Sequence, residues 1–293
     1  MSLVLVLGQS GQIARELAKL GAPEGLELVF AGRERLDLAA ADPGPLVEQL
    51  HPAAVINAAA YTAVDKAESE PDAAFRLNRE VPAGLARACA AARVPLVHFS
   101  TDYVFDGTKP QPYVETDPVN PTGVYGASKA EGEAAVLAAG GPAIVLRTSW
   151  VYSAFGANFV KTMLRLAATR EDVGVVGDQL GRPTWAEDCA RGALRSVQAL
   201  LDGEVTGAAL FHLAGDGDAT WADLAEAIFK QSAAQGGPSA RVTRITTADY
   251  PTPAKRPANS RLDCDKIVRT LGLQPRPWRG SLAACFAELE TQS

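Results

Sequence analysis

The sequence predicts an α/β protein in which a doubly wound parallel sheet carries a smaller C-terminal lobe. Three observations predict this fold. Short runs rich in Val, Leu and Ile alternate with helical patterns through the first half of the chain, as they do in parallel sheets covered on both faces. A glycine-containing turn follows the first of these runs. After residue 150 the alternation becomes irregular, which indicates a separate lobe.

The first half of the chain contains five apolar runs that are strand candidates, with helical patterns between them. The expected strands cover residues 3–7, 26–31, 54–58, 95–100 and 143–148. The expected helices cover residues 12–20, 73–92 and 121–138. Right-handed crossovers between such strands produce a doubly wound sheet. Asn120 and Pro121 fit an N-cap followed by a proline at the first position of the third helix.

The second half of the chain mixes helices with short strands and a proline-rich loop. The expected helices cover residues 158–169, 185–200, 220–232, 264–271 and 280–289. The expected strands cover residues 173–176 and 210–213, and the loop covers residues 250–257. Thr220 is the expected N-cap of its helix.

Composition excludes several classes of protein. The chain of 293 residues is 47% hydrophobic and has a net charge of −6, so we expect a globular core and no nucleic-acid partner, since nucleic-acid binders present a basic face. No apolar run is long enough for a signal peptide or a membrane span, so we expect a cytoplasmic protein with no membrane partner. No Cys-x-x-Cys pair occurs, which argues against a zinc site or a disulfide framework.

The turn after the first strand has the spacing of a dinucleotide-binding loop. Glycines at 8 and 11 permit a tight turn and the close approach of a pyrophosphate, and the following helix supplies free N–H groups and a partial positive charge. The alternative is a purely structural turn, since many strand-to-helix turns favour glycine. The residues expected to contact the cofactor here are Gly8, Gln9, Ser10, Gly11, Gln12 and Ile13.

The end of the second expected strand bears on the choice between NADH and NADPH. A carboxylate there binds the 2′-hydroxyl of NAD, whereas arginine accepts the 2′-phosphate of NADP. No acid sits at the end of this strand, and Arg33 follows it, so we expect NADPH to be used at least as well as NADH. The alternative is that Arg33 is a solvated loop charge. Asp37 and Leu38 are expected to flank the adenine.

Polar side chains follow the fourth strand, and a tyrosine and a lysine follow them on a helix. Ser100, Thr101 and Asp102 come at the carboxyl end of the strand, where open α/β sheets bind ligands. Tyr125 and Lys129 are four residues apart, and so share one helix face. Small residues after the third strand, at 58–60, leave room for a dinucleotide, although helix packing explains them equally well.

Tyrosine and lysine in this arrangement predict proton transfer beside a nicotinamide. Reduction of a ketone needs a hydride and a proton, and Tyr125 is the expected proton donor. A nearby ammonium lowers the pKa of a phenol, and Lys129 is also expected to hold the nicotinamide ribose. Thr101 is expected to orient the substrate carbonyl. A Tyr/Lys pair on a surface helix face is the alternative.

These motifs together resemble the extended short-chain dehydrogenase/reductase superfamily, whose dinucleotide-binding part is a Rossmann sheet. Longer stretches resemble one family within it, the dTDP-4-dehydrorhamnose reductases. The resemblance runs nearly end to end, with Ala14 in place of a common glycine and Tyr61 in place of a histidine found in some relatives. The stretches that carry it are residues 57–71, 100–107, 147–152, 158–163, 250–257 and 259–262.

The resemblance implies reduction of the 4-keto group of dTDP-6-deoxy-L-lyxo-4-hexulose to dTDP-L-rhamnose. It assigns catalysis to Tyr125, Lys129 and Thr101. With the motifs above, it adds as cofactor residues Ala58, Ala59, Ala60, Tyr61, Thr62, Phe99, Ser100, Tyr125 and Lys129. The implied substrate residues are Thr101, Asp102, Tyr125, Trp150, Asn158, Arg256 and Asn259. Arg256 and Asn259 are expected to meet the diphosphate, which needs cationic and amide donors.

The change of pattern after residue 150 predicts a domain division, and the resemblance implies an oligomeric state. We expect a dinucleotide-binding domain over residues 1–152, with a return segment near 183–215, and a substrate-binding lobe formed by residues 153–182 and 216–293. Some relatives are homodimers that bind Mg²⁺ at the interface through three glutamates, and Glu16, Glu187 and Glu288 stand at matching positions. Solvated helix charges are the alternative for all three.

Two other functions stay open from the sequence. One is a different nucleotide-sugar enzyme of the same superfamily, such as another reductase, an epimerase or a dehydratase. A dehydratase is disfavoured because Tyr103, and not a second acid, follows Asp102. The other is a non-catalytic regulatory subunit of methionine adenosyltransferase, which a relative of this family provides.

Overall fold

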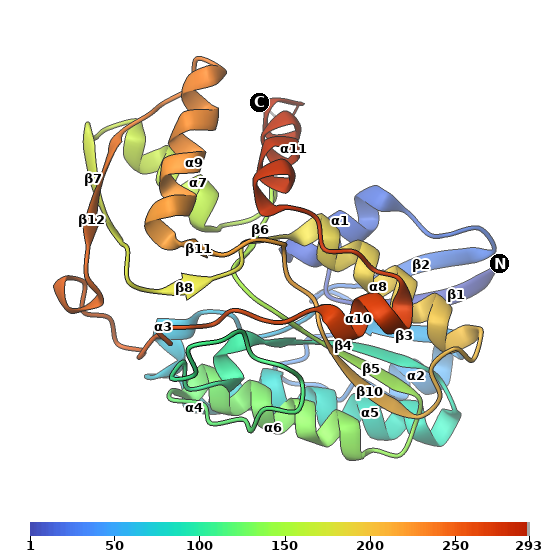
Figure 1. Ribbon diagram of the computed structural model, residues 1–293. Helices are drawn as coiled ribbons and strands as arrows, with labels where there is room; N and C mark the ends of the chain where they lie inside the picture. The colour runs from blue at the N-terminus through green and yellow to red at the C-terminus, as the bar shows by residue number, and fades with distance from the viewer. Residues whose placement is uncertain (292–293) are drawn as a thin grey trace.

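The computed structural model describes residues 1–291 and confirms an α/β fold built on one parallel sheet (Figure 1). Six strands lie in the order β10-β5-β4-β3-β1-β2, and every neighbouring pair is parallel. Their bounds are β1 (Ser2–Leu7), β2 (Leu26–Ala31), β3 (Ala54–Asn57), β4 (Leu96–Thr101), β5 (Ala143–Thr148) and β10 (Ala208–His212).

The strand order is that of a doubly wound sheet. β1 pairs with β2 on one side and with β3 on the other, so the chain reverses its direction of travel across the sheet between these two crossovers. Ligands of open α/β sheets bind at such a reversal, outside the carboxyl ends of the strands. β3, β4 and β5 are buried along their whole length, which explains why their sequences are continuous apolar runs.

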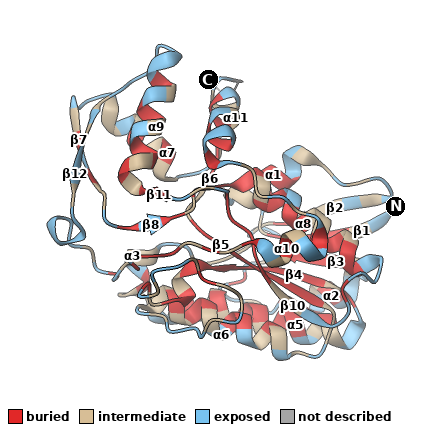
Figure 2. Ribbon diagram, viewed as in Figure 1, coloured by how far each residue is buried: buried red, intermediate tan, exposed pale blue. Residues whose placement is uncertain are grey.

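Helices cover both faces of the sheet (Figure 2). α1 (Gln12–Leu20) and α8 (Ala186–Leu201) pack together on one face and share a core cluster with β3 and β4. The other face carries α2 (Gly44–Leu50), α5 (Val81–Ala92) and α6 (Val124–Ala138), which form a second cluster with β1 and β5. The two apolar faces of the sheet are therefore both withdrawn from water.

A smaller C-terminal lobe has its own core beside the sheet (Figure 1). The aromatic side chains buried in this core are Tyr152, Trp185, Phe229, Trp278 and Phe286. Thr220 caps α9 as predicted, in a capping box with Asp223. The main elements of the lobe are α7 (Phe159–Ala167), β7 (Asp172–Val176), α9 (Trp221–Ala234), β12 (Arg241–Ile245) and α11 (Trp278–Thr291).

Short elements connect the lobe to the sheet. β6 pairs with β9, and β11 pairs with β8, while α10 packs beside the sheet through Ile267 and Leu271. The bounds are β6 (Val151–Tyr152), β8 (Leu180–Gly181), β9 (Thr184–Trp185), β11 (Ala219–Thr220) and α10 (Asp265–Leu271).

Two helix predictions were wrong in detail. The segment expected as one helix over 73–92 contains α4 (Pro71–Phe75), a π-helical stretch η1 (Arg76–Glu80) and α5. Asn120 and Pro121 do not begin α6, because Asn120 instead donates its side-chain amide to Asp106. Gly123 is the N-cap, and Glu68 accepts the N–H of Val124 at 2.8 Å. A distant carboxylate therefore replaces the local cap that the sequence suggested.

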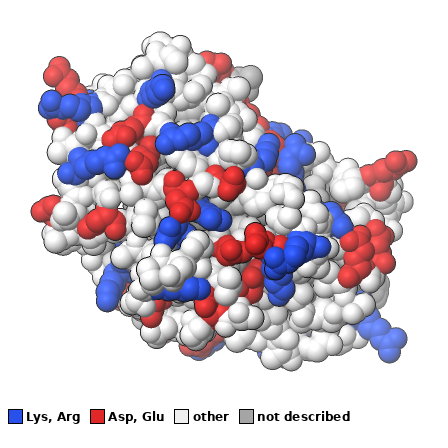
Figure 3. Space-filling model, viewed as in Figure 1, with Lys and Arg blue, Asp and Glu red and all other residues white. Residues whose placement is uncertain are grey.

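The surface carries charges of both signs, and the cysteines are buried. On the face shown in Figure 3, basic and acidic side chains alternate over the surface. Within residues 1–291, no helix has both the length and the apolar character needed to cross a membrane. The four cysteines are buried free thiols, namely Cys89, Cys189, Cys264 and Cys285.

Candidate active site

A cleft of about 490 Å³ lies outside the carboxyl ends of β1, β3, β4 and β5. The sequence-predicted residues that line it are Ser10, Gly11, Gln12, Ile13, Ala58, Ala59, Ala60, Thr62, Phe99, Ser100, Thr101, Asp102, Tyr125, Lys129, Trp150 and Asn158. The cleft therefore joins the glycine turn to the Tyr/Lys pair.

The glycine turn is shaped for close approach of a ligand to the backbone. Gly8 has a φ of +102°, and a side chain there would meet the backbone nitrogen of Ala59 at 3.3 Å. Gly11 is the N-cap of α1, and no side chain caps its first turn. The open N–H groups and the helix dipole thus face the cleft, and they fit the pyrophosphate of a dinucleotide.

Small residues after β3 form the neighbouring wall of the cleft, and buried amides hold them. Asn57 accepts the N–H of Ala59 at 3.2 Å and lies 3.1 Å from His98 Nδ1. Asn78 accepts the N–H of Tyr61 at 2.9 Å and donates to Ser128 on α6. This network fixes the wall against α6. The Tyr61 ring points elsewhere, since its hydroxyl donates to Glu70, and it does not line the cleft.

The polar end of β4 brings a hydroxyl and a carboxyl group into the cleft. Thr101 Oγ1 donates to Asp102 Oδ1 at 2.9 Å and accepts the N–H of Tyr103 at 3.2 Å. Both Thr101 and Asp102 are buried. Burial raises the pKa of Asp102 to about 6, because a charged carboxylate loses solvation there. The carboxyl group next to Thr101 therefore has a pKa closer to neutrality than that of a free aspartate.

α6 places Tyr125 and Lys129 on the side of the cleft next to Thr101. Lys129 is buried, and its Nζ donates to the backbone oxygen of Phe99 at 2.5 Å. Burial lowers the pKa of Lys129 to about 8, while the charge of Glu133 raises it. The ammonium is therefore present below a pH of about 8 and lost above it.

The predicted electrostatic effect of Lys129 on Tyr125 is not what the structure shows. Burial raises the pKa of Tyr125 to about 12, although a hydrogen bond with Thr101 lowers it. Desolvation therefore outweighs the expected depression. Tyr125 stays a neutral phenol near pH 7, which is the protonation state that a proton donor requires.

Trp150 forms the wall between the sheet and the C-terminal lobe. Its backbone φ is +49°, and its ring stacks on that of Trp221 with 3.6 Å between centroids and 9° between planes. The ring also lies close to Gly181, where an added side chain would collide with it. Trp150 is thus held flat at the mouth of the cleft by two elements of the lobe.

Asn158 lines the cleft but also has structural partners. It caps α7, since its side chain accepts the N–H of Lys161 at 3.2 Å. Its amide donates to Gln12 at 3.1 Å and to Ser153 O at 2.7 Å. Asn158 therefore connects the lobe to the first turn of α1.

Several sequence-predicted residues lie outside the cleft. Arg33 is exposed beyond β2, and Asp37 caps its own turn by accepting the N–H of Ala39 at 3.1 Å. Arg256 forms an ion pair with Asp65 at 2.9 Å, between the loop after β12 and the short α3 (Val64–Ala67). The predicted residues that do not line the cleft are Gly8, Gln9, Arg33, Asp37, Leu38, Tyr61, Arg256 and Asn259.

Asn259 lies outside the cleft, and its amide is used inside the protein. The side-chain nitrogen donates to the backbone oxygens of Lys109 and Gln111, and the oxygen accepts from Arg261. Asn259 is also buried. Asn259 anchors neighbouring loops here, and its contact with the diphosphate stays a prediction.

Tyr103 lines the cleft, although the sequence did not single it out. Its ring packs edge-on to that of Tyr125, with 5.5 Å between centroids and 77° between planes. The signal was its place directly after Thr101 and Asp102. The other lining residues that were missed are Asn57, Val64, Thr148, Val151, Gly156 and Ala157.

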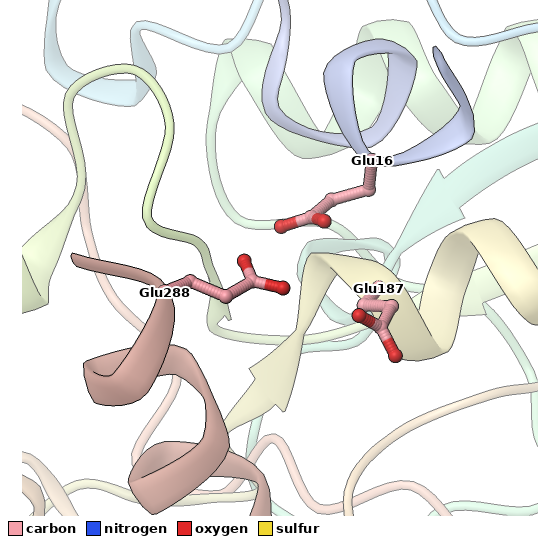
Figure 4. Close-up of side chains that lie close together, drawn as sticks. All are labelled: Glu16, Glu187 and Glu288. Atoms are coloured by element: carbon pink, nitrogen blue, oxygen red, sulfur yellow. The ribbon is translucent and has the colours of Figure 1, made fainter. Parts of the chain in front are cut away.

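The three predicted metal ligands come together away from the cleft (Figure 4). Glu16 on α1, Glu187 on α8 and Glu288 on α11 have carboxylate oxygens that lie within 4.8 Å of one another. However, Lys19 Nζ lies 2.8 Å from Glu16 and 2.7 Å from Glu187, and it also pairs with Glu288. The trio already has a cation of the protein, so these residues do not fit Mg²⁺ unless Lys19 moves away.

Comparison with known proteins identifies the family. Residues 1–291 match the family model described as RmlD substrate binding domain. A dTDP-4-dehydrorhamnose reductase of Sinorhizobium fredii is 48% identical over 94% of this chain and 94% of its own length. The Escherichia coli K12 protein of the same name is 39% identical over 98% of both chains.

Solved structures give the same result. A Clostridium acetobutylicum dTDP-4-dehydrorhamnose reductase superposes with a TM-score of 0.91 at 36% identity, covering 98% of this chain and 99% of the other. The Bacillus anthracis reductase in complex with NADP has a TM-score of 0.89 at 32% identity, with the same coverage. The chain therefore belongs to the dTDP-4-dehydrorhamnose reductase family.

Proposed function

We propose that this protein uses NADPH to reduce the 4-keto group of dTDP-6-deoxy-L-lyxo-4-hexulose, giving dTDP-L-rhamnose. The observation that carries the proposal is one cleft lined by the glycine turn and by Thr101, Tyr125 and Lys129. The activity named for relatives at 39–48% identity supports it.

The side chains of the cleft divide the work of a ketone reduction. The nicotinamide, when bound, supplies the hydride. Tyr125 gives its phenolic proton to the oxygen at position 4, and Thr101, which is hydrogen-bonded to Tyr125, orients that oxygen. Lys129, fixed by Phe99 O, holds the nicotinamide ribose. Trp150 provides a flat apolar wall for the sugar ring.

The cofactor proposal rests on the absence of an acid at the end of β2. Gly32 and the exposed Arg33 follow this strand, where NAD-specific sites place a carboxylate for the ribose. The Bacillus anthracis relative is described in complex with NADP. We therefore expect NADPH to be used at least as well as NADH, with Arg33 as the partner of the 2′-phosphate.

Three further expectations stay predictions. Homodimer formation is implied by the resemblance. The cytoplasmic location follows from the lack of a long apolar run, and the division into a dinucleotide-binding domain and a substrate-binding lobe follows from the change of pattern after residue 150. Mg²⁺ at the glutamate trio is disfavoured by Lys19, which neutralises part of the same charge.

A coupled assay tests the proposal. dTDP-4-keto-6-deoxyglucose is supplied with a separate 3,5-epimerase, and NADPH loss is followed together with the identity of the product. We expect NADPH consumption equal to the dTDP-L-rhamnose formed. No consumption, together with co-purification of a methionine adenosyltransferase, would instead support the regulatory alternative.

A further inference from the structure

One face of α6 carries three titratable side chains at successive turns. Tyr125, Lys129 and Glu133 are each four residues apart and therefore align along the helix. Tyr125 and Lys129 line the cleft. Glu133 does not, yet it is buried with only 4% of its surface exposed. A buried carboxylate needs a reason, since burying an unpaired charge is costly.

Arg147 on β5 is the partner of this carboxylate. Its Nε donates to Glu133 Oε2 at 2.8 Å, and its Nη2 donates to Oε1, which makes the pair bidentate. Arg147 Nη1 lies 3.3 Å from His212 Nε2, and the guanidinium packs over the ring of Phe105. Because arginine only donates, His212 must accept there, and its Nδ1 donates to Tyr113 O at 3.1 Å.

The two members of the pair come from different elements. Glu133 stands on the helix that carries Lys129, whereas Arg147 belongs to the strand behind it. The charge of Glu133 raises the pKa of Lys129 against the lowering effect of burial. The elements packed against α6 also carry other titratable groups. His98 on β4 and His212 on β10 are kept neutral by burial, Tyr103 and Tyr125 are neutral phenols, and burial raises the pKa of Asp102 to about 6.

We infer that Glu133, held by Arg147, is a positioning residue that keeps Lys129 charged and in register with the cofactor ribose. The inference rests on the proposed function of Lys129. The Glu133–Arg147 pair has two effects. The bidentate contact fixes α6 on β5, and the carboxylate supplies the counter-charge that a buried ammonium otherwise lacks.

The test follows cofactor binding against pH. NADPH is titrated into wild type and into Glu133→Gln by the change in nicotinamide fluorescence. NADPH affinity falls at high pH as Lys129 loses its proton, and this fall is the basic limb of the binding curve. Removing the carboxylate lowers the pKa of Lys129, so the basic limb moves down by about one pH unit. At about pH 8 we expect binding to weaken about fivefold, with little change at about pH 6, where Lys129 is protonated in both proteins. Lys129→Met removes the limb and defines the baseline.

Two further variants separate positioning from folding. Glu131→Gln removes an exposed carboxylate of the same helix, which pairs with Arg79, and should leave the limb in place. Glu133→Gln leaves Arg147 unpaired and buried, so it also lowers the Tm. The double variant Glu133→Gln/Arg147→Met removes both charges and should recover Tm while the limb stays low.

A limb that does not move in Glu133→Gln, or that returns to its wild-type position together with Tm in the double variant, overturns the inference and leaves a purely structural pair. Failure of the proposed function is distinguishable, since it shows as absent turnover of the keto sugar in wild type. The binding titration does not depend on turnover.

Discussion

Tyr125 shows how one residue depends on its surroundings for its role. The spacing to Lys129 suggested a phenol made more acidic, whereas burial in the cleft keeps the pKa of Tyr125 at about 12. A donor with this pKa holds its proton near pH 7 until an alkoxide develops beside it, and then releases it to the stronger base. The role of the residue was predictable from sequence, but its electrostatic state required the folded cleft.

Removing the phenolic hydroxyl tests that role. Tyr125→Phe should lower kcat about a thousandfold, within the range for loss of a general acid. NADPH affinity should change little, because the ring is retained. Tyr250→Phe is the control, since this ring is exposed and outside the cleft. Turnover near the wild-type rate in Tyr125→Phe would remove it from the proton-donor role.

Arg33 carries the prediction on cofactor choice. If it pairs with the 2′-phosphate, Arg33→Ala should raise the KM for NADPH about tenfold and leave the KM for NADH unchanged, because one charge-assisted contact is lost. Arg35→Ala is the matched control two residues away. Equal effects of Arg33→Ala on the two cofactors would show that Arg33 is a solvated loop charge.

At the scale of elements, continuous apolar runs made the central strands predictable, and short or exposed elements escaped. α2 has seven residues and contains a proline at its start, so it has too few turns to show a period. β12 is mostly exposed beside β7, and its sequence lacks a buried stripe. The π-helical stretch η1 was invisible because an inserted residue in a helix leaves no distinct composition.

Lys19 joins α1, α8 and α11 through the glutamate trio, and it gives a test at this scale. Lys19→Met leaves three close carboxylates without their shared cation, so we expect a lower Tm from their repulsion. Millimolar Mg²⁺ should restore part of the Tm in the variant, while wild type should respond neither to Mg²⁺ nor to chelator. Lys230→Met, an exposed lysine on α9, is the control. A wild-type Tm that falls with chelator would contradict this assignment.

At the scale of the whole molecule, the cleft is made by the parallel sheet and by the C-terminal lobe, which come from different parts of the sequence. The strand ends and the glycine turn were found because each motif is local. The contacts of Arg256 with Asp65 and of Asn259 with Lys109 and Gln111 join segments far apart in sequence. No local pattern in the sequence predicts such pairings, so these intramolecular partners of Arg256 and Asn259 could be found only in the folded chain.

The most direct test of the account follows the hydride itself. Wild-type protein is given the keto sugar, the epimerase and NADPH deuterated at the transferable position of the nicotinamide, and the sugar product is examined by NMR. The account predicts one deuterium, at carbon 4 of dTDP-L-rhamnose. A product without deuterium, as an internal hydride shuttle of an epimerase would give, or with deuterium at another carbon, would contradict it.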